Sequence, residues 1–128
     1  MSLKDNLHVM VVDDMSTSRA LITQALEEIG IYKVVTENDG KAALDRLIAR
    51  PVHLVLSDLN MPGLDGLGLL KALRQNKSTQ KIGFILVTGT PSKELIETGT
   101  KWGLNNLIKK PFNAASMKQS IERVVGKL

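Results

Sequence analysis

The sequence lacks several features that mark other classes of protein. It contains no cysteine among its 128 residues, which excludes disulfide bonds, thiolate metal ligands and a thiol nucleophile. No apolar run approaches the roughly 20 residues of a membrane-spanning helix, and no secretory signal follows Met1. Aromatic residues make up only 3% of the chain, so few rings are present to stack on a flavin or a nucleobase. We therefore expect a cytoplasmic protein without a membrane segment.

Positive charge is in modest excess, with a formal net charge of +4, but it is not concentrated into a binding surface. The densest basic group lies on one predicted helix and its exit loop, without aromatic residues between its members. The group consists of Lys71, Arg74, Lys77 and Lys81. This pattern is typical of a solvated helix face. We expect no nucleic-acid partner, and we expect a monomer.

Length and composition predict one compact domain. Hydrophobic residues make up 43% of the chain and charged residues 23%, which is typical of globular proteins. A chain of this length can bury about 68% of its unfolded surface. No linker, repeat or low-complexity segment interrupts the sequence. We therefore expect residues 1–128 to form a single domain.

Short apolar runs and helical repeats alternate along the chain, which predicts five strands and five helices. The predicted strands cover residues 8–12, 32–36, 53–57, 82–87 and 107–108. The first helix can be capped by Ser16 or Thr17, and it can end at Gly30 in the left-handed conformation. Thr90 followed by Pro91 opens the fourth helix, whose thin apolar stripe predicts the highest mobility.

This alternation predicts an α/β fold in which parallel strands are linked by right-handed crossovers. Helices then cover both faces of a doubly wound, five-stranded parallel sheet. We adopt the strand order 2-1-3-4-5, the common flavodoxin-like arrangement of five strands. Ligands of such sheets bind at the carboxyl ends of the strands, where the strand order reverses. That point falls between the first and third strands.

Polar side chains follow the predicted strands at this edge of the sheet. Asp13 and Asp14 follow the first strand, and Asp58 follows the third. Thr88 follows the fourth strand, and Lys110 ends the fifth. Three neighbouring carboxylates repel one another, so a cation must neutralise them. Mg²⁺ fits because it prefers oxygen ligands, uses few carboxylates and retains waters, whereas zinc prefers histidine or cysteine.

The same residues suit phosphoryl transfer. Its transition state spreads charge over three equatorial oxygens and needs positioned positive charge and hydrogen-bond donors more than acid or base chemistry. Mg²⁺, the Lys110 ammonium and the Thr88 hydroxyl can each supply part of this stabilisation. Asp58 is the candidate nucleophile because its strand is central. Asp13 and Asp14 are adjacent in the sequence and better placed as metal ligands.

Several motifs together resemble the receiver domains of two-component response regulators. They are the Asp13-Asp14 pair, the segment Asp58-Leu59-Asn60-Met61-Pro62-Gly63-Leu64-Asp65-Gly66, Thr88-Gly89 and Lys110-Pro111. The resemblance covers nearly the whole chain, and it is to stand-alone, chemotaxis-type (CheY-like) regulators. It implies a signalling domain rather than an enzyme, one that catalyses its own phosphorylation and dephosphorylation.

By this resemblance, Asp58 takes a phosphoryl group from a phosphohistidine on a sensor histidine kinase of the chemotaxis type. The backbone carbonyl of Asn60 would join the three aspartates as a magnesium ligand. Thr88 would turn toward the phosphoryl group, and Lys110 would pair with it across a bond to Pro111 that is often cis. The signal would pass through the face of the fourth helix, fifth strand and final helix to a flagellar motor switch protein or a phosphatase.

One position departs from the family pattern. Family members commonly have an aromatic residue in the fifth strand whose ring turns inward as the threonine moves, and Leu107 stands there in this sequence. Leucine has neither a ring nor a hydroxyl, so two roles remain open: a switch that binds the motor, and a phosphate sink or relay intermediate. Trp102 lies nearby and could serve a partner surface or ordinary packing.

Two other functional classes share parts of the pattern. A magnesium-dependent phosphohydrolase of the haloacid dehalogenase type also uses Asp, Thr and Lys. Its nucleophile, however, stands on the first strand, two residues before a second aspartate. A flavodoxin-like electron carrier shares the strand order, but Asp13 and Asp14 would repel the flavin phosphate. Both classes are therefore less favoured than a receiver domain.

Some polar residues near the predicted strands are better explained by structure than by function. Alternation along the strand places Lys109 and Lys110 on opposite faces, so Lys109 should face solvent. His8 and His53 begin adjacent strands at the opposite end of the sheet, too far away to join the site. Asp65 is expected to cap a helix.

Overall fold

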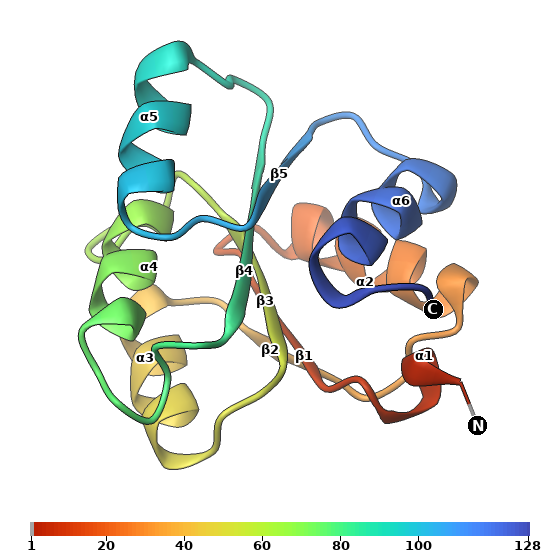
Figure 1. Ribbon diagram of the computed structural model, residues 1–128. Helices are drawn as coiled ribbons and strands as arrows, with labels where there is room; N and C mark the ends of the chain where they lie inside the picture. Colours follow the sequence, from red (N-terminus) through yellow and green to blue (C-terminus); the bar gives the residue numbers. More distant parts are fainter. Residues whose placement is uncertain (1) are drawn as a thin grey trace.

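The computed structural model describes residues 2–128 and shows a five-stranded sheet with helices on both faces (Figure 1). The strands are β1 (Val9–Val12), β2 (Val34–Glu37), β3 (Leu54–Asp58), β4 (Gly83–Thr88) and β5 (Asn106–Lys109). The helices described are α1 (Leu3–Asn6), α2 (Ser16–Ile29), α3 (Gly40–Ala49), α4 (Gly66–Arg74), α5 (Lys93–Lys101) and α6 (Ala114–Val125). Neighbouring strands pair in parallel in the order β2-β1-β3-β4-β5. The predicted fold and strand order are confirmed.

The three inner strands are almost completely buried. Every residue of β1 and β3 is buried, and in β4 only the first residue, Gly83, is partly exposed. The edge strands β2 and β5 are partly exposed. Strands covered by helices on both faces need apolar residues at every position, which explains the continuous apolar runs. The candidate site therefore lies at the ends of the most deeply buried strands of the sheet.

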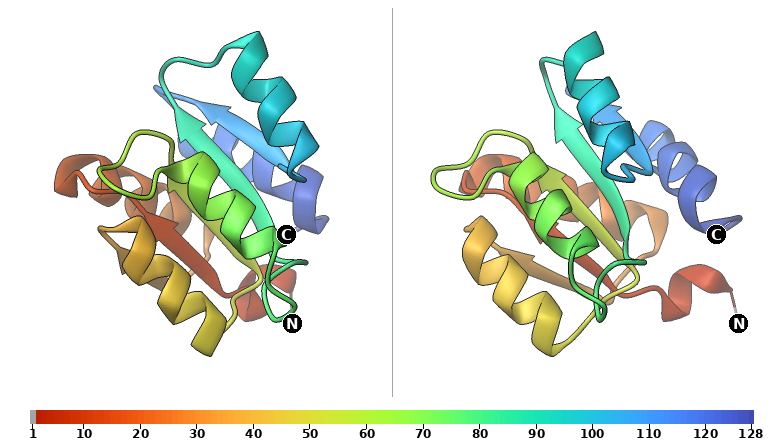
Figure 2. Two further views of the ribbon diagram at one scale, coloured as in Figure 1. Left: turned by 90° about the vertical axis from the view of Figure 1, so that its left-hand side faces the viewer. Right: turned by 60° about the vertical axis from the view of Figure 1, so that its left-hand side comes forward.

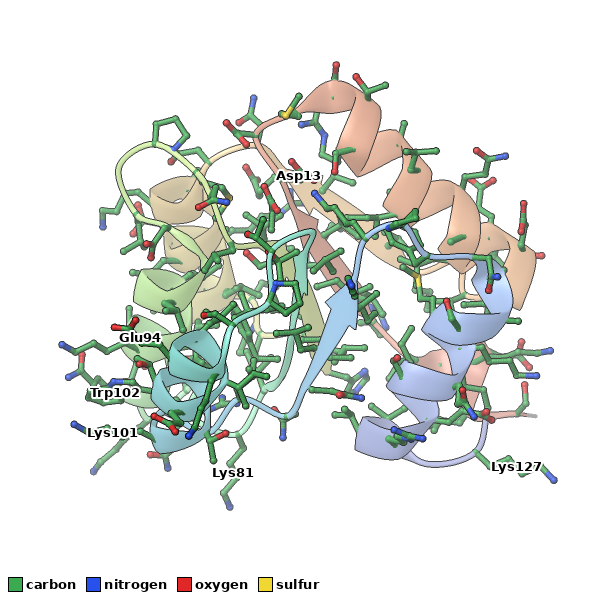
Figure 3. All side chains as sticks on the ribbon, turned by 90° about the horizontal axis from the view of Figure 1, so that it is seen from above. Asp13, Lys81, Glu94, Lys101, Trp102 and Lys127 are labelled. Carbon is green, nitrogen blue, oxygen red and sulfur yellow. The ribbon has the colours of Figure 1, made fainter. Side chains whose placement is uncertain are left out.

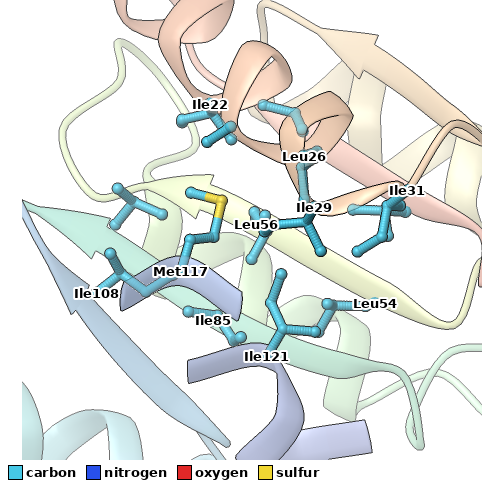
Figure 4. Close-up of a cluster of buried hydrophobic side chains, with 14 of the residues drawn as sticks. Ile22, Leu26, Ile29, Ile31, Leu54, Leu56, Ile85, Ile108, Met117 and Ile121 are labelled. Atoms are coloured by element: carbon cyan, nitrogen blue, oxygen red, sulfur yellow. The ribbon is translucent and has the colours of Figure 1, made fainter. Parts of the chain in front are cut away.

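Two apolar cores attach the helices to the sheet. Val9 and Val11 point into one core, which includes side chains of α2 and α6 (Figure 4). Met10 and Val12 point into the other, which includes side chains of α3, α4 and α5. Figure 2 shows the molecule with α3, α4 and α5 turned toward the viewer. Alternate residues of each strand thus serve opposite layers, and the strand ends are held firmly from both sides.

The helix that follows β1 starts differently from the prediction. Its N-cap residue is Met15, so neither Ser16 nor Thr17 caps it. The Asp13 carboxylate accepts a hydrogen bond from the Met15 N–H at 3.0 Å, which fixes the chain at this turn. Gly30 ends the helix with a φ of 100°, as predicted. The start of α2 is therefore set by a residue of the candidate site.

The helix α5 begins two residues later than the Thr90-Pro91 start that the sequence suggested. The Ser92 hydroxyl accepts the Leu95 N–H at 3.0 Å and caps the helix. The Thr90 N–H instead donates to the Thr88 hydroxyl at 3.1 Å, which holds this segment in a turn. Within α5 only Leu95 and Gly99 are buried, in keeping with its thin apolar stripe.

Smaller differences concern the ends of the chain's elements. The four-residue helix α1 was not predicted, because it is too short for an apolar repeat. The second strand begins at Val34, and Tyr32 lies outside it with 73% of its surface exposed. Asp65 caps α4 as predicted by accepting the Gly68 N–H at 2.7 Å. Among residues 2–128, no helix is both long enough and apolar enough to cross a membrane.

Candidate functional site

Three carboxylates meet at the carboxyl end of the sheet. Asp13 and Asp14 follow β1, and Asp58 is the last residue of the neighbouring strand β3. One oxygen from each carboxylate lies within 4.8 Å of the other two. The register pairs Val12 with Ser57, so the two strands end side by side. Figure 3 looks onto this edge, with Asp13 labelled near the start of α2.

The environment of Asp13 suits a bound cation. Its side chain is completely buried, and its Oδ1 accepts the hydrogen bond from Met15 N–H. Its Oδ2 is buried but receives no hydrogen bond from any residue between 2 and 128. A buried carboxylate oxygen without a partner costs free energy, and a metal ion removes that cost. Asp14 is exposed, so solvent reaches the cluster from one side. These oxygens fit a hard divalent cation such as Mg²⁺.

Lys110 completes the charged centre beside Asp58. Its Nζ lies 3.2 Å from Asp58 Oδ1, and the Asp58 side chain is 11% exposed. Burial raises the pKa of the Asp58 carboxyl above its ordinary value, and the negative charge of Asp13 acts in the same direction. The hydrogen bond and positive charge of Lys110 lower this pKa but do not outweigh burial. The fold therefore holds the Asp58 carboxylate in an environment less favourable to its charge than water.

The segment after β5 presents Lys110 to the site. The Lys110 N–H donates to the Thr88 carbonyl at 2.8 Å, and the bond to Pro111 is cis. Lys109 is exposed, as predicted. The Lys110 Nζ also donates to the Ser18 hydroxyl at 3.1 Å. Sequence reasoning did not assign Ser18 to the site, because no local pattern relates residues 92 positions apart.

Thr88 and Asn60 lie on neighbouring segments of the same edge. Thr88 ends β4, one residue beyond the partner of Asp58 in the register, and is 2% exposed. Its hydroxyl accepts the Thr90 N–H and can also donate. Asn60 is exposed, two residues after Asp58 in the loop before α4. The roles predicted for these two residues remain predictions.

The two histidines lie outside this site. They stand just before β1 and β3, at the opposite ends of those strands from Asp13 and Asp58. The His53 Nδ1 accepts a hydrogen bond from the His8 N–H at 2.9 Å, and the two ring centroids are 5.6 Å apart. The histidines thus pair with each other, as expected for residues at the beginning of adjacent strands.

Comparison with known proteins agrees with this geometry. Residues 9–122 match the response regulator receiver domain. The chain belongs to this family. A curated relative, the probable chemotaxis protein CheY of Rhizobium etli, is 39% identical over 128 residues, covering 100% of this chain and 99% of the relative.

Solved structures of other receiver proteins share the fold. Chemotaxis protein CheY4 of Vibrio cholerae superposes with a TM-score of 0.85 at 29% identity, covering 92% of this chain and 98% of that one. The receiver domain of sensor histidine kinase PA1611 from Pseudomonas aeruginosa gives a TM-score of 0.84 at 23% identity, covering 94% and 98%. The PA1611 structure has a magnesium ion coordinated in its active-site cleft.

Leu107 and Trp102, which the sequence analysis singled out, both pack against the interior. Leu107 of β5 is partly buried and packs against the core shared by α3, α4 and α5. Trp102, labelled in Figure 3, packs against the same core. The Lys71 Nζ lies 5.0 Å from the centroid of its ring. These contacts support a packing role for Trp102. No ring occupies position 107, so any inward movement on the β5 side would involve an aliphatic side chain.

Proposed function

We propose that this receiver domain is a phosphorylation switch in which Asp58 accepts a phosphoryl group from a phosphohistidine on a sensor histidine kinase. The main support is the convergence of the Asp58 carboxylate with two further carboxylates and with Lys110 Nζ, 3.2 Å away. An Asp58 oxygen forms a bond to phosphorus while the phosphorus–nitrogen bond breaks, and the departing imidazole nitrogen keeps the bonding electron pair. The product is an acyl phosphate on Asp58.

Asp13, Asp14, Asp58 and the backbone carbonyl of Asn60 would hold a Mg²⁺ ion. When bound, Mg²⁺ supplies positive charge that stabilises the phosphoryl oxygens and neutralises the carboxylates. The Oδ2 of Asp13 supports this assignment, because it is a buried acceptor that receives no hydrogen bond from residues 2–128 and belongs to a carboxylate of the cluster.

Lys110 and Thr88 would serve the phosphoryl group directly. The Lys110 ammonium already reaches Asp58 Oδ1, so it can donate a hydrogen bond to a phosphoryl oxygen attached there. The Thr88 hydroxyl accepts from the Thr90 N–H and also lies 3.5 Å from the Thr90 hydroxyl, so its own proton can be donated elsewhere only if that second contact is given up. A turn of Thr88 toward the phosphoryl group would change that contact. The change would reach the segment that leads into α5.

The test of the phosphoacceptor role is labelling of the purified chain by acetyl phosphate. We expect a labile acyl phosphate in magnesium buffer and none in EDTA. Asp13→Asn keeps the acceptor for Met15 N–H but removes one negative charge, so it should raise the magnesium concentration for half-maximal labelling at least about tenfold. Asp45→Asn is the matched control, because Asp45 is an exposed carboxylate outside the cluster. Equal labelling with and without magnesium would contradict the proposal.

The chemotaxis role is the second part of the proposal. It is supported by the names of the relatives, a probable chemotaxis CheY and a chemotaxis CheY4. The partner that donates phosphate would be a chemotaxis-type histidine kinase. The output surface would be the face formed by α5, β5 and α6. Ile96 of α5 exposes 48% of its surface. A flagellar motor switch protein or a phosphatase would bind this face.

A phosphate sink or relay intermediate is the alternative, and Leu107 is the observation that favours it. Without an aromatic ring at this position, phosphorylation has a weaker physical route to the output face. The deciding measurement is the affinity of a flagellar switch protein for the chain before and after phosphorylation. A motor switch should bind at least about tenfold more tightly when phosphorylated, a free-energy difference of about 1.4 kcal/mol. A sink should show no difference.

A further inference from the structure

We propose that Ser18 is a positioning residue that holds the Lys110 ammonium in place for the phosphoryl group. This inference rests on the function proposed above. Lys110 Nζ lies between two oxygens, 3.2 Å from Asp58 Oδ1 and 3.1 Å from Ser18 Oγ. The first contact joins the lysine to the phosphoacceptor. The second joins it to the first turn of α2, on the other side of the site.

A neutral acceptor is well suited to this task. An ammonium group has three N–H donors, and two of them are directed at Asp58 and Ser18. The third stays available for a phosphoryl oxygen. The serine hydroxyl orients the ammonium without cancelling its charge, whereas a carboxylate at position 18 would compete with the phosphoryl group for it. Preorganised positive charge is most effective where negative charge develops.

Lysine needs such an anchor because its side chain is long and flexible. Holding it in one conformation costs rotamer entropy, and the Lys110 side chain is 30% exposed. A second hydrogen bond reduces the number of conformations in which the ammonium misses Asp58. Ser18 therefore contributes to the rate at which the site reacts rather than to the binding of the metal.

The turn that carries Ser18 is itself fastened to the acidic cluster. Asp13 Oδ1 accepts the Met15 N–H at 3.0 Å, and the Asp13 carbonyl accepts a hydrogen bond from Arg19 Nη1 at 2.7 Å. These two bonds flank Ser18 in the sequence. They fix the first turn of α2 relative to the carboxylates, so the Ser18 hydroxyl has a defined position.

A helix-capping role does not account for Ser18. The N-cap of α2 is Met15, and Ser18 lies inside the helix. Within residues 2–128 its hydroxyl makes one hydrogen bond, the one with Lys110. Alanine is a better helix former than serine, so Ser18→Ala should leave the stability of α2 unchanged or slightly improved. An effect of this substitution on reactivity can therefore be separated from an effect on folding.

The first test is the rate of labelling by acetyl phosphate at saturating magnesium. Ser18→Ala should slow labelling roughly 3- to 10-fold, the effect of losing one hydrogen bond that orients a charged group. Ser18→Thr restores a hydroxyl and should recover most of the rate, while the magnesium dependence stays unchanged in both variants. Ser16→Ala is the control, because Ser16 is exposed in the same turn. Unchanged rates in Ser18→Ala, or a Ser18→Thr variant as slow as Ser18→Ala, would overturn the inference.

The second test needs neither metal nor phosphodonor. The NMR signals of the Lys110 Cε methylene should shift in Ser18→Ala and keep their wild-type positions in Ser16→Ala. Identical Lys110 signals in the wild type and Ser18→Ala would show that the contact does not form. If the wild type fails to label at all, the proposed function is wrong, while the NMR result still decides whether Ser18 holds Lys110.

Discussion

Asp58→Asn is expected to lose labelling by acetyl phosphate at least about a hundredfold, because an amide oxygen is not a competent nucleophile toward phosphorus. Asparagine has nearly the same shape as aspartate, and its carbonyl can still accept the hydrogen bond from Lys110 Nζ. The site should therefore keep its arrangement while losing its reactive group. The measurement is mass spectrometry of the intact chain after exposure to acetyl phosphate in magnesium buffer.

The fold of Asp58→Asn provides the necessary control. Burial and the charge of Asp13 raise the pKa of Asp58, so ionised Asp58 is less favourable in the fold than in water. In EDTA at neutral pH, the variant should resist urea at least as well as the wild type. Labelling of Asp58→Asn at the wild-type rate, with the label on another residue, would refute the assignment of the phosphoacceptor.

Gly66→Ala is expected to destabilise the fold by about 3 kcal/mol. A Cβ atom at this position would lie 2.4 Å from the Asp58 carbonyl oxygen and 2.8 Å from Leu86 Cδ2. The Gly66 N–H also donates to the Leu59 carbonyl at 2.9 Å, so the start of α4 is tied to the chain just after Asp58. A shift of the start of α4 or of the chain after β3 would therefore also displace Asp58. The measurement is the free energy of unfolding in urea.

Gly89→Ala is the matched control for this prediction. The nearest atom to its added Cβ would be Lys110 Cβ at 3.9 Å, an ordinary contact distance. Its unfolding free energy should stay within about 0.5 kcal/mol of the wild type. If Gly66→Ala were as stable as Gly89→Ala, the close approach of α4 to the end of β3 would not be a constraint on this fold.

Most of the architecture could be predicted because each strand and helix carries its own local signal. The buried strands are continuous apolar runs in the sequence, and Gly30 and Asp65 mark helix ends that the structure confirms. The starts of α2 and α5 were predicted wrongly because each is set by a contact with a residue outside the helix. Asp13 fixes the turn before α2, and Thr88 holds Thr90 outside α5. Both deciding residues belong to the site rather than to the helix concerned.

The site was predictable to the extent that topology alone brings its residues together. Parallel strands place Asp13, Asp58 and Lys110 at one edge whatever the details of packing, and the structure confirms that they meet. Ser18 could not be found in this way, because its contact with Lys110 depends on how α2 rotates against the segment after β5. The unpartnered Oδ2 of Asp13 likewise depends on packing, and no sequence pattern reports it.

The charges around Asp58 have a consequence for the states of the switch. When ionised, the three carboxylates and Lys110 together leave two negative charges, which one divalent cation balances to neutrality. An aspartyl phosphate replaces a single negative charge by about two. With a divalent cation bound, the unphosphorylated site would therefore have no net charge. The phosphorylated site would have a net charge of about −1. In the proposed switch, that residual negative charge would attract the Thr88 hydroxyl away from Thr90 and toward the phosphoryl group.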